Sequence, residues 1–595
     1  MRILGYFLLS VFALMGFLFC LLLGLGGYAL SQFQEDPLPE TMVLSLEIGD
    51  SLPEDPASGF LDQMSDLLAG EEPRARLVDV VAAIDRAAED PAVRGLFLHV
   101  RSGTLGMAQA QELRAAVLRF RQKSDKETVA FAESFGEGAD GTIPYYVATA
   151  AKDIWLQPSG LVGTTGFAVR QPYLRGLLDE WGVEPEFQAR KQYKTAMAFL
   201  SDYQQSPAER EALQGLVDGW LSQVVAGIVS ARGLPEQEVR TLIDASPLLA
   251  PVANEGKLID YIGYRDQIVS AMGLSFRAGD NLSSRMIPLA RYVRAHAATP
   301  ADARARKIAY ICATGTIVVG DGRGVSGSRM VDARALASTI ERAAADSEVV
   351  AIVLRIDSPG GSYVGSDVVW RAIEKVREAG MPVIASLGDV AASGGYFMAM
   401  GTSHIVAQPG TLTGSIGVVS GKVNIQALST RNRVAWDGVQ AGRNAAMYAL
   451  SQPFDEAARA HLSATLDAIY ADFTGKVARG RSLSLERVEE AAQGRVWLGE
   501  QALKLGLVDE LGGLPEAIRA ARREAGLDES TPYTLVPFGS SPSPFGLFAK
   551  NLDRVETILN LGVTLSPGLR AAEPWLRTLD GEGAVLMLEP LSVNR

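Results

Sequence analysis

A serine among small residues, Ser393, is the first candidate for chemistry in this chain. It lies in "GDVAASGGYFMAM" (388–400), between two alanines and two glycines and just ahead of an apolar run that predicts a helix. Small residues allow a substrate or another part of the chain to approach the hydroxyl closely. A serine hydroxyl is a poor nucleophile until a base removes its proton, and this stretch contains no histidine. The base must therefore come from elsewhere in the sequence.

The chain contains two tandem copies of one sequence unit, and this duplication predicts its fold. In each copy, amphipathic helical stretches alternate with short β-rich runs such as "GLFLHV" and "VAIVLRI". That alternation predicts an α/β fold with stacked parallel strands in two tandem repeats. The matching segments are 82–102 with 337–358, and 145–169 with 396–420.

The two copies differ at the positions that could carry chemistry. Counting back from a Gln-Pro pair that both copies share places Thr142 opposite Ser393. In "RIDSPGGSYVGSD" the second copy ends a strand with Gly360 and Gly361, whereas Thr104 and Leu105 occupy these positions in the first copy. The second copy thus has a nucleophile and a glycine turn that the first lacks.

The first copy has a lysine that the second lacks. Lys194 lies in "ARKQYKTAMAF", and the matching stretch of the second copy has Arg443 and Asn444. Arginine stays protonated and an amide has no useful basicity, so neither can act as a base. We therefore expect one composite site in which Lys194 is the general base for Ser393, as in known Ser-Lys pairs. Burial would lower the pKa of the lysine towards neutrality, with walls expected from Tyr193, Ala196, Met197 and Phe199.

Further groups could stabilise the charges of such a reaction. The N–H of Gly394, together with that of Gly361, could hold a developing oxyanion, and such donors contribute roughly 10² to 10³ in rate each. Ser415 in "LTGSIG" is a candidate hydroxyl for orienting the lysine.

The bulk composition excludes several other classes of function. A chain of 595 residues needs more than one core. Its net charge of −13 argues against a nucleic-acid partner. Two cysteines and four scattered histidines provide neither a disulfide framework nor a metal site. We expect no metal and no cofactor.

The N-terminal segment predicts a membrane anchor. Residues 3–30 carry no charge, which is enough to cross roughly 30 Å of hydrocarbon. A cleaved signal peptide is the alternative, but its apolar region usually runs only about 7–15 residues. Arg2 precedes the span and acidic residues follow it, so the positive-inside rule leaves the bulk of the chain outside the cytoplasm.

Together "DSPGGS", "AASGGY", "LTGSIG" and "QYKTA" resemble the long, duplicated form of the signal peptide peptidase A family. The resemblance implies a membrane-anchored bacterial serine protease with the Clp protease/crotonase fold. By motif, it implies that Ser393 is the nucleophile, Lys194 the base and Ser415 the lysine-orienting group. The oxyanion donors fall on Gly394 and on either Gly360 or Gly361. One departure is Asp389, where a small residue is common in the family.

The resemblance also implies a biological setting. The protein would be a homotetramer on the periplasmic face of the bacterial inner membrane, where it would cut remnant signal peptides and other apolar peptides. The alternatives are a crotonase-like acyl-CoA enzyme, which needs neither a nucleophilic serine nor an anchor, and an inactive membrane-tethered scaffold. The expected domains are an anchor at 1–31, repeats at 40–296 and 307–535, a linker at 297–306 and a tail at 536–595.

Three other residues of reactive type are expected to have structural roles. Lys191 is predicted to be an exposed neighbour of Lys194, and His404 a structural residue of a strand. Asp357 ends a strand, where a turn or capping role fits better than that of a triad acid.

Overall fold

The structure is a computed structural model. It describes residues 37–54, 75–272, 285–297, 304–320, 330–528, 530–539 and 586–587. The predicted membrane span at 3–30 and most of the tail at 536–595 lie outside the described residues.

A parallel β-sheet forms the centre of each repeat, and the two sheets have the same strand order. In repeat 1, the described residues up to 297, the order is β8-β4-β3-β2-β1-β9. In repeat 2, from residue 304 onwards, the path β20-β16-β15-β13-β10-β21 repeats it. The strands of repeat 1 are β1 (Met42–Ile48), β2 (Val93–Val100), β3 (Glu127–Ala132), β4 (Asp153–Leu156), β8 (Tyr261–Ile262) and β9 (Met286–Pro288). Those of repeat 2 are β10 (Arg306–Thr314), β13 (Val349–Ser358), β15 (Val383–Ala392), β16 (His404–Ala407), β20 (Glu510–Leu511) and β21 (Tyr533–Pro537).

The central strands of repeat 2 are largely apolar because helices cover both faces of its sheet. In β13, for example, Ile352 and Leu354 pack into one apolar cluster with α13 and α14, while Ala351 and Val353 pack into another with α20. The helices of repeat 2 are α13 (Ala333–Ala345), α14 (Tyr363–Glu378), α15 (Gly394–Ala399), α16 (Gln426–Arg431), α17 (Glu456–Arg481), α18 (Leu485–Ala491), α19 (Gly499–Lys504) and α20 (Leu514–Glu524). Those of repeat 1 are α3 (Leu77–Glu89), α4 (Met107–Lys123), α5 (Thr142–Ala148), α6 (Arg175–Trp181), α7 (Ala198–Ser201), α8 (Pro207–Arg232), α9 (Glu236–Asp244), α10 (Ala250–Glu255), α11 (Arg265–Ala271) and α12 (Leu289–Ala297).

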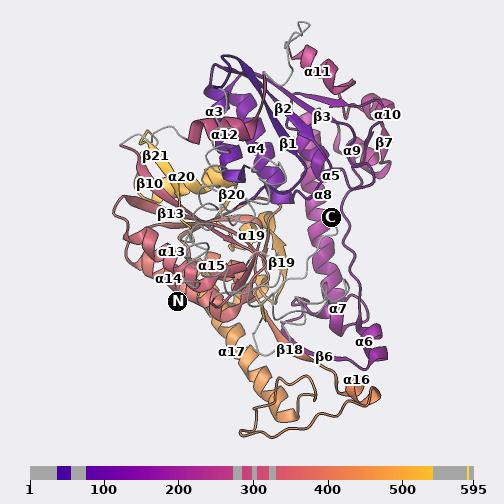
Figure 1. Cartoon of the computed structure of the whole chain (residues 1–595), viewed down its shortest axis with the longest axis vertical. Coiled ribbons are helices and arrows are strands. Elements are labelled where there is room, and N and C mark those ends of the chain that lie inside the picture. The colour runs from indigo at the N-terminus through magenta and orange to yellow at the C-terminus, as the bar shows by residue number, and fades with distance from the viewer. Residues whose placement is uncertain are drawn as a thin grey trace, which may run out of the picture.

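A third sheet joins the two repeats away from their central sheets. Strand β6 (Glu184–Arg190) of repeat 1 pairs antiparallel along its whole length with β18 (Val418–Asn424) of repeat 2. Figure 1 shows this pair in the lower half of the molecule, below α8 and alongside α17. The remaining strands of this sheet are β11 (Thr316–Val318), β12 (Met330–Asp332), β14 (Gly361–Ser362) and β22 (Leu586–Met587). The two repeats are therefore joined by a β-sheet to which both contribute strands, in addition to packing side by side.

Strand β15 changes its neighbour partway along its length. Its first part pairs with β16, up to Leu387 against Ala407, and its last part pairs with β17 (Leu412–Gly414), from Val390 to Ala392. The register with β13 also shifts between these two parts. β17 in turn pairs with β19 (Val496–Leu498), and repeat 1 has a short antiparallel pair of β5 (Leu161–Val162) with β7 (Leu248–Leu249). The bulge in β15 redirects the strand towards Ser393.

One helix among the described residues, α8, is long and apolar enough to cross a membrane. Its residues Leu216, Trp220 and Val224 are buried in the core of repeat 1, and Trp220 donates its indole N–H to the carbonyl of Gly410 (2.9 Å). These contacts identify α8 as a core helix of repeat 1 that also contacts repeat 2.

The α/β class and the two tandem repeats predicted from the sequence are confirmed. The domain bounds stay a prediction. The pairing of β6 with β18 is a connection between the repeats that the sequence did not predict.

Candidate active site

Ser393 lies at the junction between the end of β15 and the start of α15. Its side chain is fully buried, and its backbone has φ 55° and ψ −114°. A positive φ is uncommon for a residue with a side chain and needs support from its surroundings. Here the Ser393 N–H donates to the carbonyl of Gly414 (2.8 Å), and the Ser393 carbonyl accepts from Phe397 (2.8 Å). The sharp turn presents the hydroxyl beyond the end of the strand.

The glycine turn predicted from "DSPGGS" lies against this junction. A Cβ on Gly394 would lie 3.2 Å from the Gly361 nitrogen and 2.5 Å from Ser366 Oγ. Gly361 has φ +146°, and a Cβ there would lie 2.2 Å from the carbonyl oxygen of Ile317. Glycine is therefore required at 394 for the two turns to meet, and at 361 for the second turn to pack against β11. The N–H of Gly360 donates to Ser358 Oγ (3.2 Å).

Lys194 reaches the same place from repeat 1. It follows β6, and the pairing of β6 with β18 carries it into repeat 2. The N–H of Tyr193 donates to the carbonyl of Gln493 (3.1 Å). Gly494, with φ +79°, packs so closely that a Cβ there would lie 2.5 Å from the nitrogen of Lys194. The lysine is 3% exposed, so its ammonium group is almost wholly removed from bulk water.

The three predicted polar side chains meet in this buried place. Lys194 Nζ is hydrogen bonded to Ser393 Oγ at 3.0 Å and to Ser415 Oγ at 2.7 Å, with the Ser415 carbonyl at 3.3 Å. Ser415 is fully buried and has φ 51°, and its N–H donates to the carbonyl of Arg495 (2.8 Å). The candidate nucleophile, the candidate base and the hydroxyl expected to orient the base are thus arranged in one chain of contacts, an arrangement that nucleophilic catalysis requires.

Of the four residues expected to surround the lysine, three belong to one apolar cluster. Ala196 and Met197 are buried and form a cluster with Val419 of β18, against which Phe199 packs. Tyr193 differs from the expectation, because its hydroxyl donates to Glu211 (3.0 Å) and its ring lies beneath the guanidinium of Arg495. It belongs to a polar network rather than to an apolar wall.

The residues that correspond to Ser393 and Lys194 in the other repeat have different surroundings. Thr142, at the start of α5, is buried, and its hydroxyl donates to Asp140 Oδ1 (2.6 Å) and accepts from the Gly166 N–H (3.0 Å). Arg443 and Asn444 are exposed. The lysine, the serine and the paired glycines therefore come together at repeat 2, and repeat 1 supplies the lysine.

Two neighbouring residues of reactive type lie where structural roles were predicted. Lys191 is half exposed and forms an ion pair with Glu489 (2.8 Å). His404 is hydrogen bonded through Nε2 to Glu510 (3.2 Å), on the adjacent strand.

The sequence did not predict that Gly494 packs against the backbone of Lys194. Its only signal is the Gln-Gly pair in "AAQGRVW", which indicates a turn but not what the turn contacts.

Comparisons with known proteins identify the family of the chain. The sequence model described as Peptidase family S49 matches residues 121–276 and 375–528. A chloroplastic serine protease SPPA of Arabidopsis thaliana is 31% identical over 82% of this chain and 72% of its own length. Proteins named Protease 4 from Salmonella typhi and Haemophilus influenzae are 32% and 28% identical over 76% and 78% of this chain, covering 72% and 75% of theirs.

Proposed function

The chain belongs to peptidase family S49 and is a serine peptidase, and we propose that Ser393 is its nucleophile and Lys194 its general base. The observation that supports this assignment is the 3.0 Å hydrogen bond between Lys194 Nζ and Ser393 Oγ, between residues of different repeats. The bond is buried, so both groups are desolvated and held in one geometry.

The reaction that these groups support is a two-step hydrolysis. In its neutral form Lys194 Nζ accepts the proton of Ser393 as Oγ attacks the scissile carbonyl, and the lysine then donates this proton to the leaving amine. In the second step a water molecule loses a proton to Lys194 and attacks the acyl-serine. Lys194 then donates this proton to Ser393 Oγ as the ester bond breaks, which releases the acid and restores both the serine hydroxyl and the neutral lysine. Ser415 Oγ, 2.7 Å from Nζ, keeps the amine directed at the serine.

The oxyanion donors in this proposal are the N–H groups of Gly394 and Gly361. Gly361 is preferred to Gly360 because the Gly360 N–H already donates to Ser358 Oγ. Gly394 and Gly361 also lie against each other, so their N–H groups can address one oxygen atom. Such preorganised donors stabilise the tetrahedral intermediate without reorganisation during the reaction.

We propose that the substrates are remnant signal peptides and other apolar peptides. A relative from Enterococcus faecium, 30% identical over 31% of this chain, is named a putative signal peptide peptidase SppA. In keeping with this, residues 3–30 would anchor the protein in the bacterial inner membrane with both repeats on the periplasmic side. The fold would be of the Clp protease/crotonase type, with the repeats bounded at 40–296 and 307–535.

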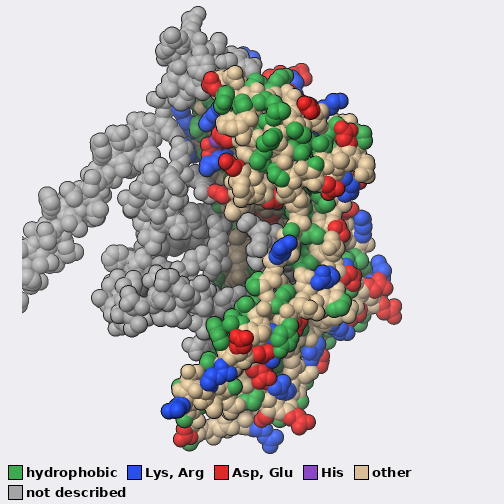
Figure 2. Space-filling model, turned by 90° about the vertical axis from the view of Figure 1, so that its right-hand side faces the viewer, with side chains coloured by type: hydrophobic (Ala, Val, Ile, Leu, Met, Phe, Trp, Pro, Cys, Tyr) green, Lys and Arg blue, Asp and Glu red, His purple; other side chains and the backbone are tan. Residues whose placement is uncertain are grey.

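We also propose that the protein is a homotetramer in which the contact between repeats recurs between chains. Within the chain, Leu514 at the start of α20 donates its N–H to Glu112 of α4 (2.7 Å). The equivalent corner of repeat 1, at β8, is exposed. Figure 2 shows apolar side chains gathered on this lobe, and they include Leu249, Val252, Tyr261, Ile262 and Tyr264.

A complementary exposed residue lies on repeat 2. Val364 is 58% exposed at the second position of α14, which corresponds to Ala108 on α4. A head-to-tail contact of this kind closes into a ring when its rotation permits. Tyr261→Glu is expected to reduce the mass measured by light scattering to that of a smaller species, and an unchanged tetramer would contradict this interface.

A fluorophosphonate probe tests the catalytic assignment. We expect labelling of the full-length protein at Ser393, mapped by peptide mass spectrometry, and none in Ser393→Ala. Labelling at another serine, or undiminished labelling of Ser393→Ala, would contradict the assignment. A crotonase-like acyl-CoA enzyme or an inactive scaffold would not be labelled at Ser393.

A further inference from the structure

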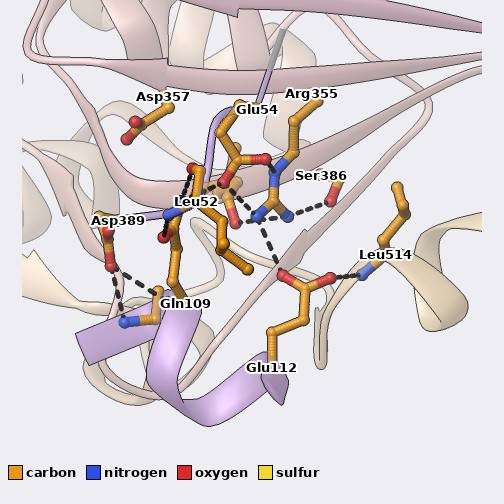
Figure 3. Close-up of polar contacts among 12 residues, drawn as sticks. Leu52, Glu54, Gln109, Glu112, Arg355, Asp357, Ser386, Asp389 and Leu514 are labelled. Carbon is orange, nitrogen blue, oxygen red and sulfur yellow. Dashed lines mark hydrogen bonds and ion pairs between the residues drawn. The ribbon is translucent and has the colours of Figure 1, made fainter. Parts of the chain in front are cut away.

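A buried polar cluster fills the joint between the two repeats (Figure 3). Its centre is Arg355 of β13, 1% exposed, which donates to both oxygens of Glu54 (3.1 and 2.9 Å) and to Glu112 of α4 (2.9 Å). Arg355 also donates to Ser386 of β15 (2.9 Å). Repeat 1 thus supplies two carboxylates and repeat 2 the cation, so the joint has one preferred geometry.

Asp389, beside this cluster, connects the joint to the end of β15. Its Oδ1 accepts the N–H groups of Ala108 (2.8 Å) and Gln109 (3.2 Å) in the first turn of α4. The residue before this helix, Gly106, has no side chain to cap it. A Cβ on Gly106 would lie 1.9 Å from Asp389 Oδ2. Helix α4 of repeat 1 is therefore capped by a residue of repeat 2, and glycine at 106 makes room for it.

The cap is attached to the bulge that redirects β15. Asp357, at the end of β13, accepts the N–H of Val390 through Oδ1 (3.0 Å), and Thr411 donates its hydroxyl to the Gly388 carbonyl (2.9 Å). A Cβ on Gly388 would lie 3.0 Å from Asp357 Cβ. Val390 also packs against the apolar core of repeat 1. The bulge 388–390 is therefore held from both repeats.

Both strands held at this bulge lead directly into the reacting groups. Four residues after Asp389 comes Ser393, and three residues after Asp357 comes the Gly360–Gly361 turn. Figure 3 shows Asp357 and Asp389 on the same side of the Arg355 cluster. A displacement of the bulge moves the nucleophile relative to Lys194, and a misplacement of about 1 Å can cost about 10²-fold in rate.

We propose that Asp389 is a positioning residue for hydrolysis: by capping α4 of repeat 1 it fixes the bulge of β15 and with it the place of Ser393. This inference rests on the proposed function, since it assumes that Ser393 and Lys194 react together. The helix needs an acceptor at this position, and asparagine is as good a cap as aspartate. The acceptor, not the negative charge, is what the proposal requires.

The test compares variants of the full-length protein by their rate of fluorophosphonate labelling and by turnover of an apolar fluorogenic tripeptide. We expect Asp389→Ala to lower the labelling rate and kcat at least about tenfold while KM changes less than about twofold. Asp389→Asn is expected to stay within about threefold of the wild type.

A matched control is Asp332→Ala. Asp332 caps α13 through the same two types of contact, to Arg334 (2.9 Å) and Ala335 (3.1 Å), but within repeat 2. It is expected to lower the melting temperature as other lost caps do and to leave kcat within about twofold.

A second variant keeps the test decisive if Asp389→Ala does not fold. Gly106→Ala alters only repeat 1, at a residue with φ −77° that alanine adopts readily, and displaces the carboxylate sterically. We expect it to slow the labelling of Ser393 as well.

Labelling of Asp389→Ala or Gly106→Ala at the rate of Asp332→Ala would overturn this proposal alone, and so would an Asp389→Asn protein as slow as Asp389→Ala. Failure of the wild type to be labelled at Ser393 would overturn the proposed function and this inference with it.

Discussion

The two repeats place different chemistry at the same point of the same scaffold. In repeat 1 the strand-to-helix junction carries Thr142, whose hydroxyl is taken up by Asp140 and Gly166. In repeat 2 it carries Ser393, whose hydroxyl contacts Lys194 of the other repeat. The sheet order is shared, so the scaffold does not decide reactivity. The proposed catalytic groups are a few residues at strand ends, and the pairing of β6 with β18 brings Lys194 to one of the two junctions.

The sharpest way to break this comparison is to remove each hydroxyl in turn. Ser393→Ala is expected to lower peptide hydrolysis by about 10³-fold or more, because it removes the proposed nucleophile. Thr142→Ala, the matched change in repeat 1, is expected to leave kcat/KM nearly unchanged. Initial rates with purified protein check both. Substantial turnover by a correctly folded Ser393→Ala protein would show that the second junction is not the reactive one.

The next largest effect concerns the lysine that repeat 1 contributes. Lys194→Arg keeps the positive charge but cannot accept a proton at workable pH, so it is expected to be as inactive as Lys194→Ala. Lys191→Ala is the control, because Lys191 is half exposed and pairs with Glu489. Near-normal turnover by Lys194→Arg would mean that charge alone suffices and that the base lies elsewhere.

A third comparison tests stability at one position of the central strand in both repeats. Arg355 in β13 and His99 in β2 occupy the same place relative to their neighbouring strands. Arg355 and its partner Glu112 are almost fully buried, whereas Glu133, the partner of His99, is half exposed. Glu112→Gln is expected to lower the free energy of unfolding by about 3 kcal/mol, because it removes one of the two carboxylates that compensate the buried charge of Arg355. Glu133→Gln is expected to cost less than about 1 kcal/mol.

Urea titrations of the two variants measure this difference. Equal losses would show that the joint between the repeats contributes no more than a surface pair does, contrary to the contacts in Figure 3.

The smallest effect is a dependence of stability on pH through Asp357, whose counterpart in repeat 1 is Arg101. Burial, followed by the charges of Asp389 and Glu54, raises the pKa of Asp357 to about 7, although Arg355 nearby opposes this.

The sign of the effect follows from this raised pKa. The unfolded chain loses the proton near pH 4 and the folded protein keeps it until about pH 7. The stabilisation is complete below about pH 4 and is lost as pH rises to about 7.

Asp357→Asn removes this titration and keeps an acceptor for Val390. We expect its unfolding free energy to vary less with pH between about 4 and 7, and to exceed that of the wild type at pH 8. Asp437→Asn, on an exposed loop, is the control and should retain the wild-type profile. A wild type and an Asp357→Asn protein with parallel pH profiles would contradict the raised pKa.

Much of the fold and of the candidate site was predictable because its signals are local or repeated. The duplication predicted two α/β repeats, and the strand orders confirm it. The complementary losses in the two copies predicted that Lys194 and Ser393 belong to one site, and their side chains are in contact. Asp389 and Gly494 carried no such signal, because their importance lies in contacts with residues about 280 and 300 positions away. Nothing in their neighbouring sequence reflects those partners.

The sequence by itself determined the residue types available for chemistry, the two copies of the scaffold and the turns that need glycine. Those features follow from side-chain chemistry and backbone sterics within short stretches. Only the tertiary structure decided how the copies meet: the pairing of β6 with β18, the cap of α4 by Asp389 and the burial of Arg355 between Glu54 and Glu112. These contacts join distant parts of the chain, and their geometry is set by the packing of whole sheets and helices rather than by any local preference.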